Sequence, residues 1–228
     1  MYNLDYLKQS HQRATSQLKE YTMHGTVQIY IKDELPKSVD IGTVLDKVST
    51  SIPSHLTREI DSIYVGMFAE FDEMETNALY KDGAIYVTND QDDEQDLIDD
   101  IIHEIAHSVE SPYGYELYAD GSLEKEFLSK RSKLYEVLEA EGLKPNKHLF
   151  INPDYTKEMD LYLYKEVGYD RLNFIVSSYG LFTSAYAATA LREYFASGFE
   201  YYFLDDRNYM CKICPVLCKK IKEIHEND

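Results

Sequence analysis

The segment from residue 92 to residue 110 constrains the fold more than any other part of this sequence. Its apolar residues recur every three to four positions, the period of a helix with one buried face; they are Leu97, Ile98, Ile101, Ile102, Ile105, Ala106 and Val109. Asn89 and Asp90 suit a helix N-cap, and the acidic run up to residue 100 suits the positive end of the helix dipole. Pro112 and Gly114 predict the end of this helix soon after Val109.

Strand patterns precede this helix, and helical patterns follow it. Strands are predicted at 27–31, 60–66 and 84–88, the last after an Asp82-Gly83 turn, and helices at 4–22, 39–52, 118–141, 155–167, 170–179 and 183–204. Residues 67–80 are ambiguous. This order predicts one α+β domain over residues 1–228. Its N-terminal lobe, 1–110, holds a small mixed sheet with helices, and its C-terminal lobe, 111–228, is mostly helical.

The charge of the chain excludes some classes of partner. The formal net charge is −18 at pH 7. Such an acidic chain repels the phosphates of nucleic acids and anionic membranes, so we expect it to bind neither. No apolar window reaches the length of a membrane span, and the N-terminus lacks the pattern of a secretory signal. The expectation is a cytoplasmic protein, or one exported by a route that uses no N-terminal signal.

Three cysteines, Cys211, Cys214 and Cys218, lie close together near the C-terminus. An odd, clustered set is not typical of a secreted disulfide framework. Their spacing of three and four residues places them on one face of a helix. We expect reduced thiols that form a small apolar stripe, rather than a second metal or redox site.

The motif His103-Glu104-Ile105-Ala106-His107 carries the chemistry that this sequence suggests. Histidines four residues apart lie on one face of a helix, so both imidazoles can reach one ion. A catalytic zinc takes three protein ligands and a water, and Glu104 is placed to remove a proton from that water. The alternative is two ordinary helix-face histidines beside a solvated carboxylate.

A third ligand must come from elsewhere in the chain, and residues 186–200 offer the best candidates. Glu193 and Glu200 are both carboxylates on a predicted helix. Tyr186 lies seven residues before Glu193, almost two helical turns, and so shares its face. A phenol on that face can donate to a developing oxyanion, and Tyr179 is a rival for this role.

The residues HEIAHSVE, with Tyr186 and the later Glu193-Tyr194-Phe195-Ala196-Ser197-Gly198-Phe199, resemble the gluzincin family of anthrax lethal factor and the clostridial Pro-Pro endopeptidases. The resemblance covers residues 97–111 and 186–203. It implies that His103, His107 and Glu193 bind one Zn²⁺ per chain. It also implies that Glu104 is the general base and Tyr186 the phenol on the oxyanion side. Glu110, just past the second histidine, is implied to hold a ligand in place.

By this resemblance the chain is expected to be a metalloendopeptidase with a minimal zincin-like fold. Strand 84–88 is then expected to form the edge of the sheet and to bind a peptide or protein substrate in extended form. The segment 143–185 is longer here than in the family. The alternatives are an inactive zincin-like binding or regulatory module, a metal-free helical interaction protein, and a hydrolase of non-peptide amides.

Overall fold

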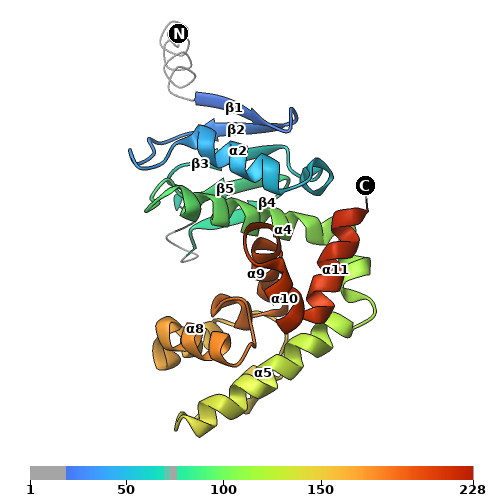
Figure 1. Cartoon of the computed structure of the whole chain (residues 1–228). Helices are drawn as coiled ribbons and strands as arrows, with labels where there is room; N and C mark the ends of the chain where they lie inside the picture. Colours follow the sequence, from blue (N-terminus) through green and yellow to red (C-terminus); the bar gives the residue numbers. More distant parts are fainter. Residues whose placement is uncertain (1–18, 70, 72–75, 228) are drawn as a thin grey trace, which may run out of the picture. The chain divides into compact units, whose positions relative to one another are not determined.

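The computed structural model describes residues 19–69, 71 and 76–227 (Figure 1). The chain divides into two compact units, Met1–Ser108 and Val109–Asp228. The division falls inside helix α4 (Glu94–Tyr118), which runs through it without a break. The α+β class is confirmed, with a mixed sheet in the N-terminal region and helices in the C-terminal part. In the described part of the chain, no helix combines the length and apolar character needed to cross a bilayer.

The first unit is built on a five-stranded sheet in the order β1-β2-β3-β5-β4. Its strands are β1 (Lys19–Met23), β2 (Val27–Ile31), β3 (Ser62–Val65), β4 (Ala78–Lys81) and β5 (Ala84–Val87). The three central strands β2, β3 and β5 are parallel, while β1 and β4 pair antiparallel with their neighbours. Strands β2, β3 and β5 confirm the predicted strand positions.

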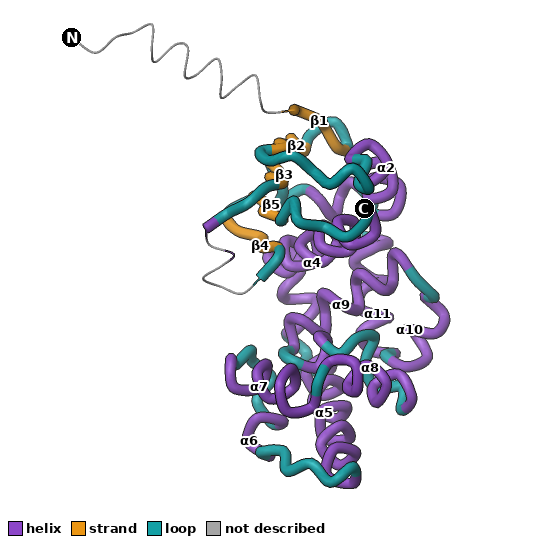
Figure 2. The backbone as a smooth tube through the Cα atoms, turned by 90° about the vertical axis from the view of Figure 1, so that its left-hand side faces the viewer, coloured by secondary structure: helices purple, strands orange, loops and turns teal. Residues whose placement is uncertain are grey.

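Helix α2 (Ile41–Ser51) and the first part of α4 lie on one face of this sheet (Figures 1 and 2). Alternate strand residues and the apolar sides of both helices are buried, including Ile29, Ile63, Ile85, Val44, Val48, Ile101 and Ile105. The other strand positions carry a ladder of stacked tyrosines, Tyr30, Tyr64 and Tyr86, with ring centroids 5.1 and 5.3 Å apart. The apolar residues of α4 thus form the buried face of the helix, as the sequence predicts.

The predicted helix over 4–22 is wrong where it can be compared. Residues 4–18 lie outside the described residues, and Lys19–Met23 form β1. This strand pairs with β2 along its whole length through a turn at His24 and Gly25, whose φ values are 53° and 75°. Ladder hydrogen bonds therefore override a helical spacing that continues from the preceding residues.

The strand predicted at 84–88 exists as β5, but it is not an edge. Strand β4 covers it, joined through Asp82 and Gly83, which have φ values of 50° and 81°. Two positive φ values give a type I′ hairpin turn, which Asp-Gly favours. The turn is recognisable in the sequence, whereas the four-residue strand before it lies in the segment 67–80, which is ambiguous in sequence. The edge strand on this side of the sheet is β4.

The second unit contains the last turns of α4 and a set of further helices. They are α5 (Ser122–Ala140), α6 (Lys147–Phe150), α7 (Lys157–Leu161), the π-helical turn η2 (Tyr162–Val167), α8 (Tyr169–Ser178), the 3₁₀ turn η3 (Tyr186–Ala188), α9 (Leu191–Leu204), α10 (Arg207–Ile213) and α11 (Pro215–Glu226). Glu126 of α5 joins three of them. Its carboxylate accepts from the Tyr194 hydroxyl at 2.8 Å and from the amides of Val216 and Leu217 at 2.9 and 3.0 Å.

Helix α4 continues past Pro112 and Gly114 to Tyr118, so the predicted end near residue 110 is wrong. An internal proline removes an amide donor and crowds the carbonyl four residues before it, a cost that packing of the following turn opposes here. Leu117 is fully buried. The Tyr118 hydroxyl donates to Glu110, one of the helix's own residues, at 2.5 Å.

The cysteines do not form a reduced stripe on one helix. Cys211 and Cys218 form a disulfide, while Cys214 is a buried free thiol. Helix α10 ends at Ile213 and α11 begins at Pro215, so the three cysteines belong to a helical corner. The break brings Cys211 and Cys218 to a Cα–Cα distance of 5.0 Å, which lies in the disulfide range.

Candidate metal centre

The two motif histidines lie on one face of α4. His103 and His107 are half-buried, and their ring centroids are 5.1 Å apart with an interplanar angle of 74°. The opposite face, with Ile101 and Ile105, is fully buried. The amphipathic period of the helix therefore fixes which way both imidazoles point.

Glu104 is buried, with an exposed fraction of 7 %. Its Oε2 accepts a hydrogen bond from the backbone amide of Tyr80 on the edge strand β4, at 2.6 Å. The Tyr80 hydroxyl in turn donates to the carbonyl of Glu59 at 3.1 Å. This partner does not follow from the sequence, because Tyr80 lies in the segment 67–80, whose pattern is ambiguous. The Asp82-Gly83 turn was the usable signal, since a hairpin turn requires a strand on each side.

Helix α9 carries Glu193 and contacts the second half of α4. Arg192 donates from Nε and Nη2 to Oε2 of Glu110, at 2.8 and 2.5 Å. Burial and the charge of Glu110 raise the pKa of the Tyr118 phenol, which keeps it protonated as a donor to that carboxylate. Glu110 follows His107 by three residues, so this contact holds α9 against the same helix that bears the histidines. Arg192 and Tyr118 are partners that the sequence alone did not reveal.

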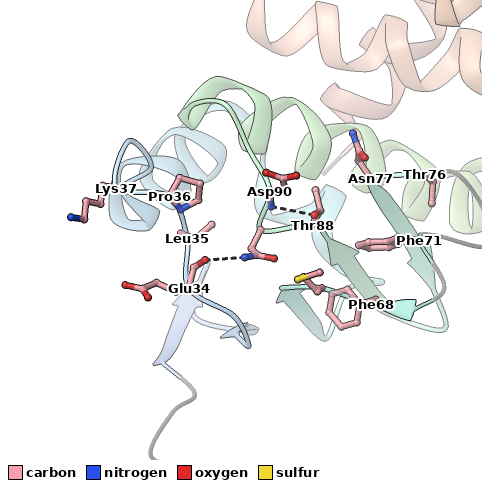
Figure 3. A pocket seen from close by; sticks show the side chains of 12 residues that line it. Glu34, Leu35, Pro36, Lys37, Phe68, Phe71, Thr76, Asn77, Thr88 and Asp90 are labelled. Atoms are coloured by element: carbon pink, nitrogen blue, oxygen red, sulfur yellow. Dashed lines mark hydrogen bonds between the residues drawn. The ribbon is translucent and has the colours of Figure 1, made fainter.

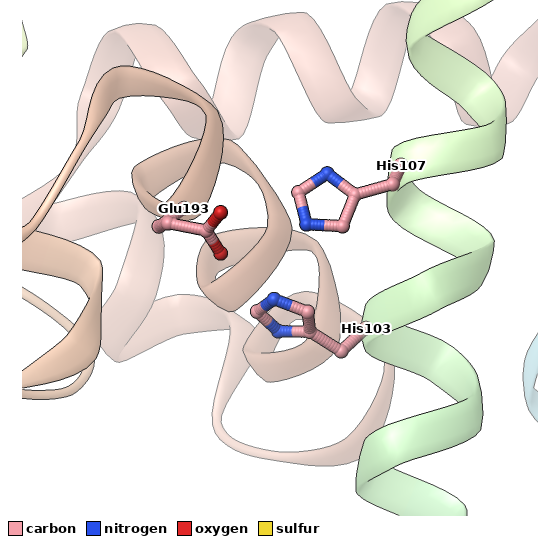
Figure 4. A group of neighbouring side chains, drawn as sticks. All are labelled: His103, His107 and Glu193. Carbon is pink, nitrogen blue, oxygen red and sulfur yellow. The ribbon is translucent and has the colours of Figure 1, made fainter. Parts of the chain in front are cut away.

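His103, His107 and Glu193 form a group that could hold a metal ion. Each offers one ligand atom, and these atoms all lie within 4.8 Å of one another (Figure 4). All three residues are half-buried. Two imidazoles and a carboxylate are ligands that divalent transition metals prefer in proteins.

Tyr186 does not share a helix with Glu193, contrary to the prediction of one helix over 183–204. It lies in η3, and Ala190, with φ −155° and ψ 163°, is extended before α9 begins. Two hydrogen bonds hold the turn: Asn173 Oδ1 of α8 accepts from the Ala185 amide at 2.7 Å, and the Thr189 hydroxyl donates to the Tyr186 carbonyl at 2.8 Å. Tyr186 is 38 % exposed as a whole residue. Partial desolvation of its hydroxyl and the negative charge of Glu193 raise the pKa of the phenol, so it remains a donor at neutral pH.

The rival residues are placed elsewhere. Glu200 lies on α9 seven residues after Glu193, about 10 Å further along the helix axis, and is not part of the metal-ligating group. Tyr179 ends α8, is 55 % exposed and interacts electrostatically with Lys133 of α5. Of the two candidate third ligands, Glu193 is the one that lies in the group that could hold a metal ion.

A separate hollow of about 1000 Å³ lies in the first unit (Figure 3). It is lined by residues that follow the carboxyl ends of β2, β3 and β5, among them Leu35, Phe68 and Thr88. The Asn89 side chain donates to the Glu34 carbonyl at 2.8 Å across its wall. None of the candidate metal-site residues lines this hollow.

Comparison of the chain with models of known families, with curated proteins and with solved structures finds no match. The likeness to the gluzincins therefore stays a prediction that rests on the motif residues in 97–111 and 186–203.

Proposed function

We propose that this chain is a zinc-dependent metallopeptidase of the gluzincin type. The observation that supports it is the group of His103, His107 and Glu193, with Glu104 next to the first histidine on the same helix. Two histidines and a glutamate form a ligand set of catalytic zinc sites, in which bonds of about 2.0–2.2 Å leave a position open for water. One ligand atom of each of the three side chains lies within 4.8 Å of the others.

The side chains divide the reaction between them. A zinc ion held there would supply Lewis acidity, polarising the attacking water and the scissile carbonyl. Glu104 takes the proton from the attacking water and passes it to the leaving amine. The Tyr186 phenol donates a hydrogen bond to the oxyanion that develops on the carbonyl oxygen.

The substrate in this proposal is a peptide or protein bound in extended form. Because β5 is internal, the strand available for pairing is β4, and the expected position of the substrate moves there from 84–88. Pairing with an edge strand uses backbone hydrogen bonds, which suits a peptide better than a small amide.

The compartment in this proposal depends on the cysteines. The sequence predicts a cytoplasmic protein, but disulfides persist mainly in oxidising compartments. The Cys211–Cys218 bond therefore favours export over the cytoplasm. The thiol content of the native protein distinguishes the two: an exported protein is expected to carry the oxidised pair, and a cytoplasmic protein reduced thiols.

Metal content is the first test of the proposal. Protein purified without added metal and analysed by mass spectrometry should carry about one zinc per chain. His107→Ala and Glu193→Ala should both lose it, and Glu200→Ala, the matched control on the same helix, should retain it. Zinc that survives Glu193→Ala, or protein that takes up no zinc on reconstitution, would contradict the proposed site.

Cleavage of a peptide library tests the activity. The wild-type protein should cut a subset of peptides, and Glu104→Ala should bind zinc but cut none. A protein that binds zinc through the three residues and leaves every peptide and protein substrate intact would instead be a zincin-like binding module.

A further inference from the structure

We propose that the backbone amide of Tyr80 positions the carboxylate of Glu104 for proton transfer, so that the edge strand is part of the catalytic machinery. This inference rests on the proposed function. Its structural basis lies entirely in the first unit, where Tyr80 N and Glu104 Oε2 are 2.6 Å apart.

The hairpin register leaves this amide outside the sheet's own hydrogen bonds. Asn77 pairs with Thr88, whose amide donates to the Asn77 carbonyl at 2.8 Å. In an antiparallel ladder, bonded and non-bonded pairs alternate. Tyr80, three residues further along β4 and opposite Ile85, therefore falls at a non-bonded pair, with its N–H pointing away from β5.

Two backbone groups on the outward edge of β4 make hydrogen bonds to side chains. The Ala78 carbonyl, which also points outward, accepts from the Thr76 hydroxyl at 2.9 Å. The Tyr80 amide, two residues on, donates to Glu104. A substrate that pairs with β4 therefore meets a strand whose amide at residue 80 is already engaged by Glu104.

Two features make this contact suited to positioning. Glu104 is almost fully buried, and a hydrogen bond from an amide to an ionised carboxylate is among the stronger ones in proteins. The donor is itself anchored, because the Tyr80 phenol is bonded to the Glu59 carbonyl. The bond engages Oε2 and restricts the rotation of the carboxylate. Tyr80 is thus a positioning residue, acting through its backbone.

Selective ¹⁵N-tyrosine labelling tests the contact without any activity measurement. Tyr80→Phe identifies the Tyr80 cross-peak by its disappearance. An amide bonded to a carboxylate should show a downfield proton that exchanges slowly, and Glu104→Ala should shift that proton upfield and speed its exchange. The Tyr86 amide on β5 is the internal control and should move little. If the chemical shift and exchange rate of the Tyr80 amide proton are the same in Glu104→Ala as in wild type, the inference is overturned.

Catalysis is tested by removing the donor alone. Tyr80→Pro deletes the amide at an edge position that needs no ladder bond, and Tyr80→Ala is the matched control that keeps the amide and loses the same side chain. We expect kcat of Tyr80→Pro to fall at least tenfold below that of Tyr80→Ala, with KM and zinc content within about twofold. Replacing Tyr80 by its α-hydroxy acid analogue removes only the N–H and gives the same comparison if the proline variant does not fold.

The outcomes separate this inference from the proposed function. A wild-type protein without zinc or cleavage defeats the proposed function, and the inference with it. An active wild type in which Tyr80→Pro and the ester variant match Tyr80→Ala defeats the inference alone. A loss that appears in KM or in zinc content, with kcat unchanged, also contradicts a role for Tyr80 in proton transfer.

Discussion

The guanidinium of Arg192 reaches one carboxylate oxygen of Glu110 through two nitrogens, although the two residues are 82 positions apart in the chain. The Glu110 side chain is 8 % exposed and that of Arg192 is 65 % exposed. Arg192 immediately precedes Glu193, and Glu110 follows His107 by less than one turn. This ion pair therefore fixes the start of α9 against the helix that bears both motif histidines.

Arg192→Ala should weaken zinc binding by about tenfold, because groups that orient metal ligands typically contribute ten- to a hundredfold to affinity. The loss follows from freedom gained by the first turn of α9, which carries Glu193. A competition titration against a chelating dye measures it.

Arg171→Ala is the matched control for that experiment. Arg171 also pairs with a glutamate, Glu141, at 3.1 Å, but the side chains of both residues are about half exposed. Both residues are also far from the histidines in sequence. Its removal should leave the affinity unchanged. Equal affinities for wild type, Arg192→Ala and Arg171→Ala would show that the ion pair has no role in the metal site.

The sequence predicted the helix of the site well and its partners poorly, for physical reasons. The apolar period of α4 runs from Leu97 to Val109, more than three turns, so the direction of His103 and His107 follows from spacing alone. Strand β4 has four residues, too few for a clear alternation, and the amide of Tyr80 is a backbone group that no motif reveals. The extended residue Ala190, which separates Tyr186 from α9, sits among good helix formers. Tertiary contacts decide such a break, as they decide that Lys19–Met23 is a strand.

The disulfide gives a prediction that does not depend on the proposed function. In protein handled without reductant, denaturation should expose one reactive thiol, that of Cys214, and reduction should expose all three. Replacing Cys211 by Ser should lower the free energy of unfolding by about 2–3 kcal/mol, the loop-closure value for a short cross-linked segment. Thiol titration and urea unfolding measure the two effects.

Cys214→Ala is the control, because it leaves the cross-link intact. It should abolish the single thiol signal and retain the stabilisation by the disulfide. Three titratable thiols in unreduced protein, with no loss of stability in Cys211→Ser, would contradict the pairing.

Asp120 should make stability depend on pH. Lys220 donates to its carboxylate at 2.9 Å, and this bond, followed by bonds from Ser122, holds the Asp120 pKa well below its ordinary value of 3.8. A carboxyl whose folded pKa is lowered stabilises the protein above its unfolded pKa and loses that effect as the pH falls. Wild type should therefore melt at a higher temperature than Asp120→Asn at pH 6, and the difference should shrink below pH 4.

Glu136→Gln provides the comparison for this titration. Glu136 pairs with Lys133 one turn away, and their side chains are 59 % and 55 % exposed, so the pair contributes little. The melting temperature of Glu136→Gln should equal that of wild type at every pH. A constant gap between wild type and Asp120→Asn from pH 7 to pH 2.5 would show that Asp120 acts by packing and not by charge.

Arg131 is expected to contribute to the stability of the second unit. It is fully buried, its guanidinium lies 5.1 and 5.7 Å from the ring centroids of Phe127 and Phe150, and it donates to the carbonyls of Leu149 (2.8 Å) and Asn152. Burial lowers its pKa to about 10, so it stays charged at neutral pH. These bonds fasten residues 147–153 to α5.

Arg131→Met keeps the length and apolar character of the side chain but leaves two carbonyls without their donor. Unsatisfied buried groups cost roughly 1–3 kcal/mol each, so we expect a loss of about 2–4 kcal/mol in urea unfolding. Limited proteolysis should then cut between residues 146 and 154, where wild type resists. Arg171→Met, at a half-exposed ion pair, should stay within about 0.5 kcal/mol of wild type. If Arg131→Met is as stable and as resistant as Arg171→Met, the segment is held by its own packing, and the arginine does not fasten it.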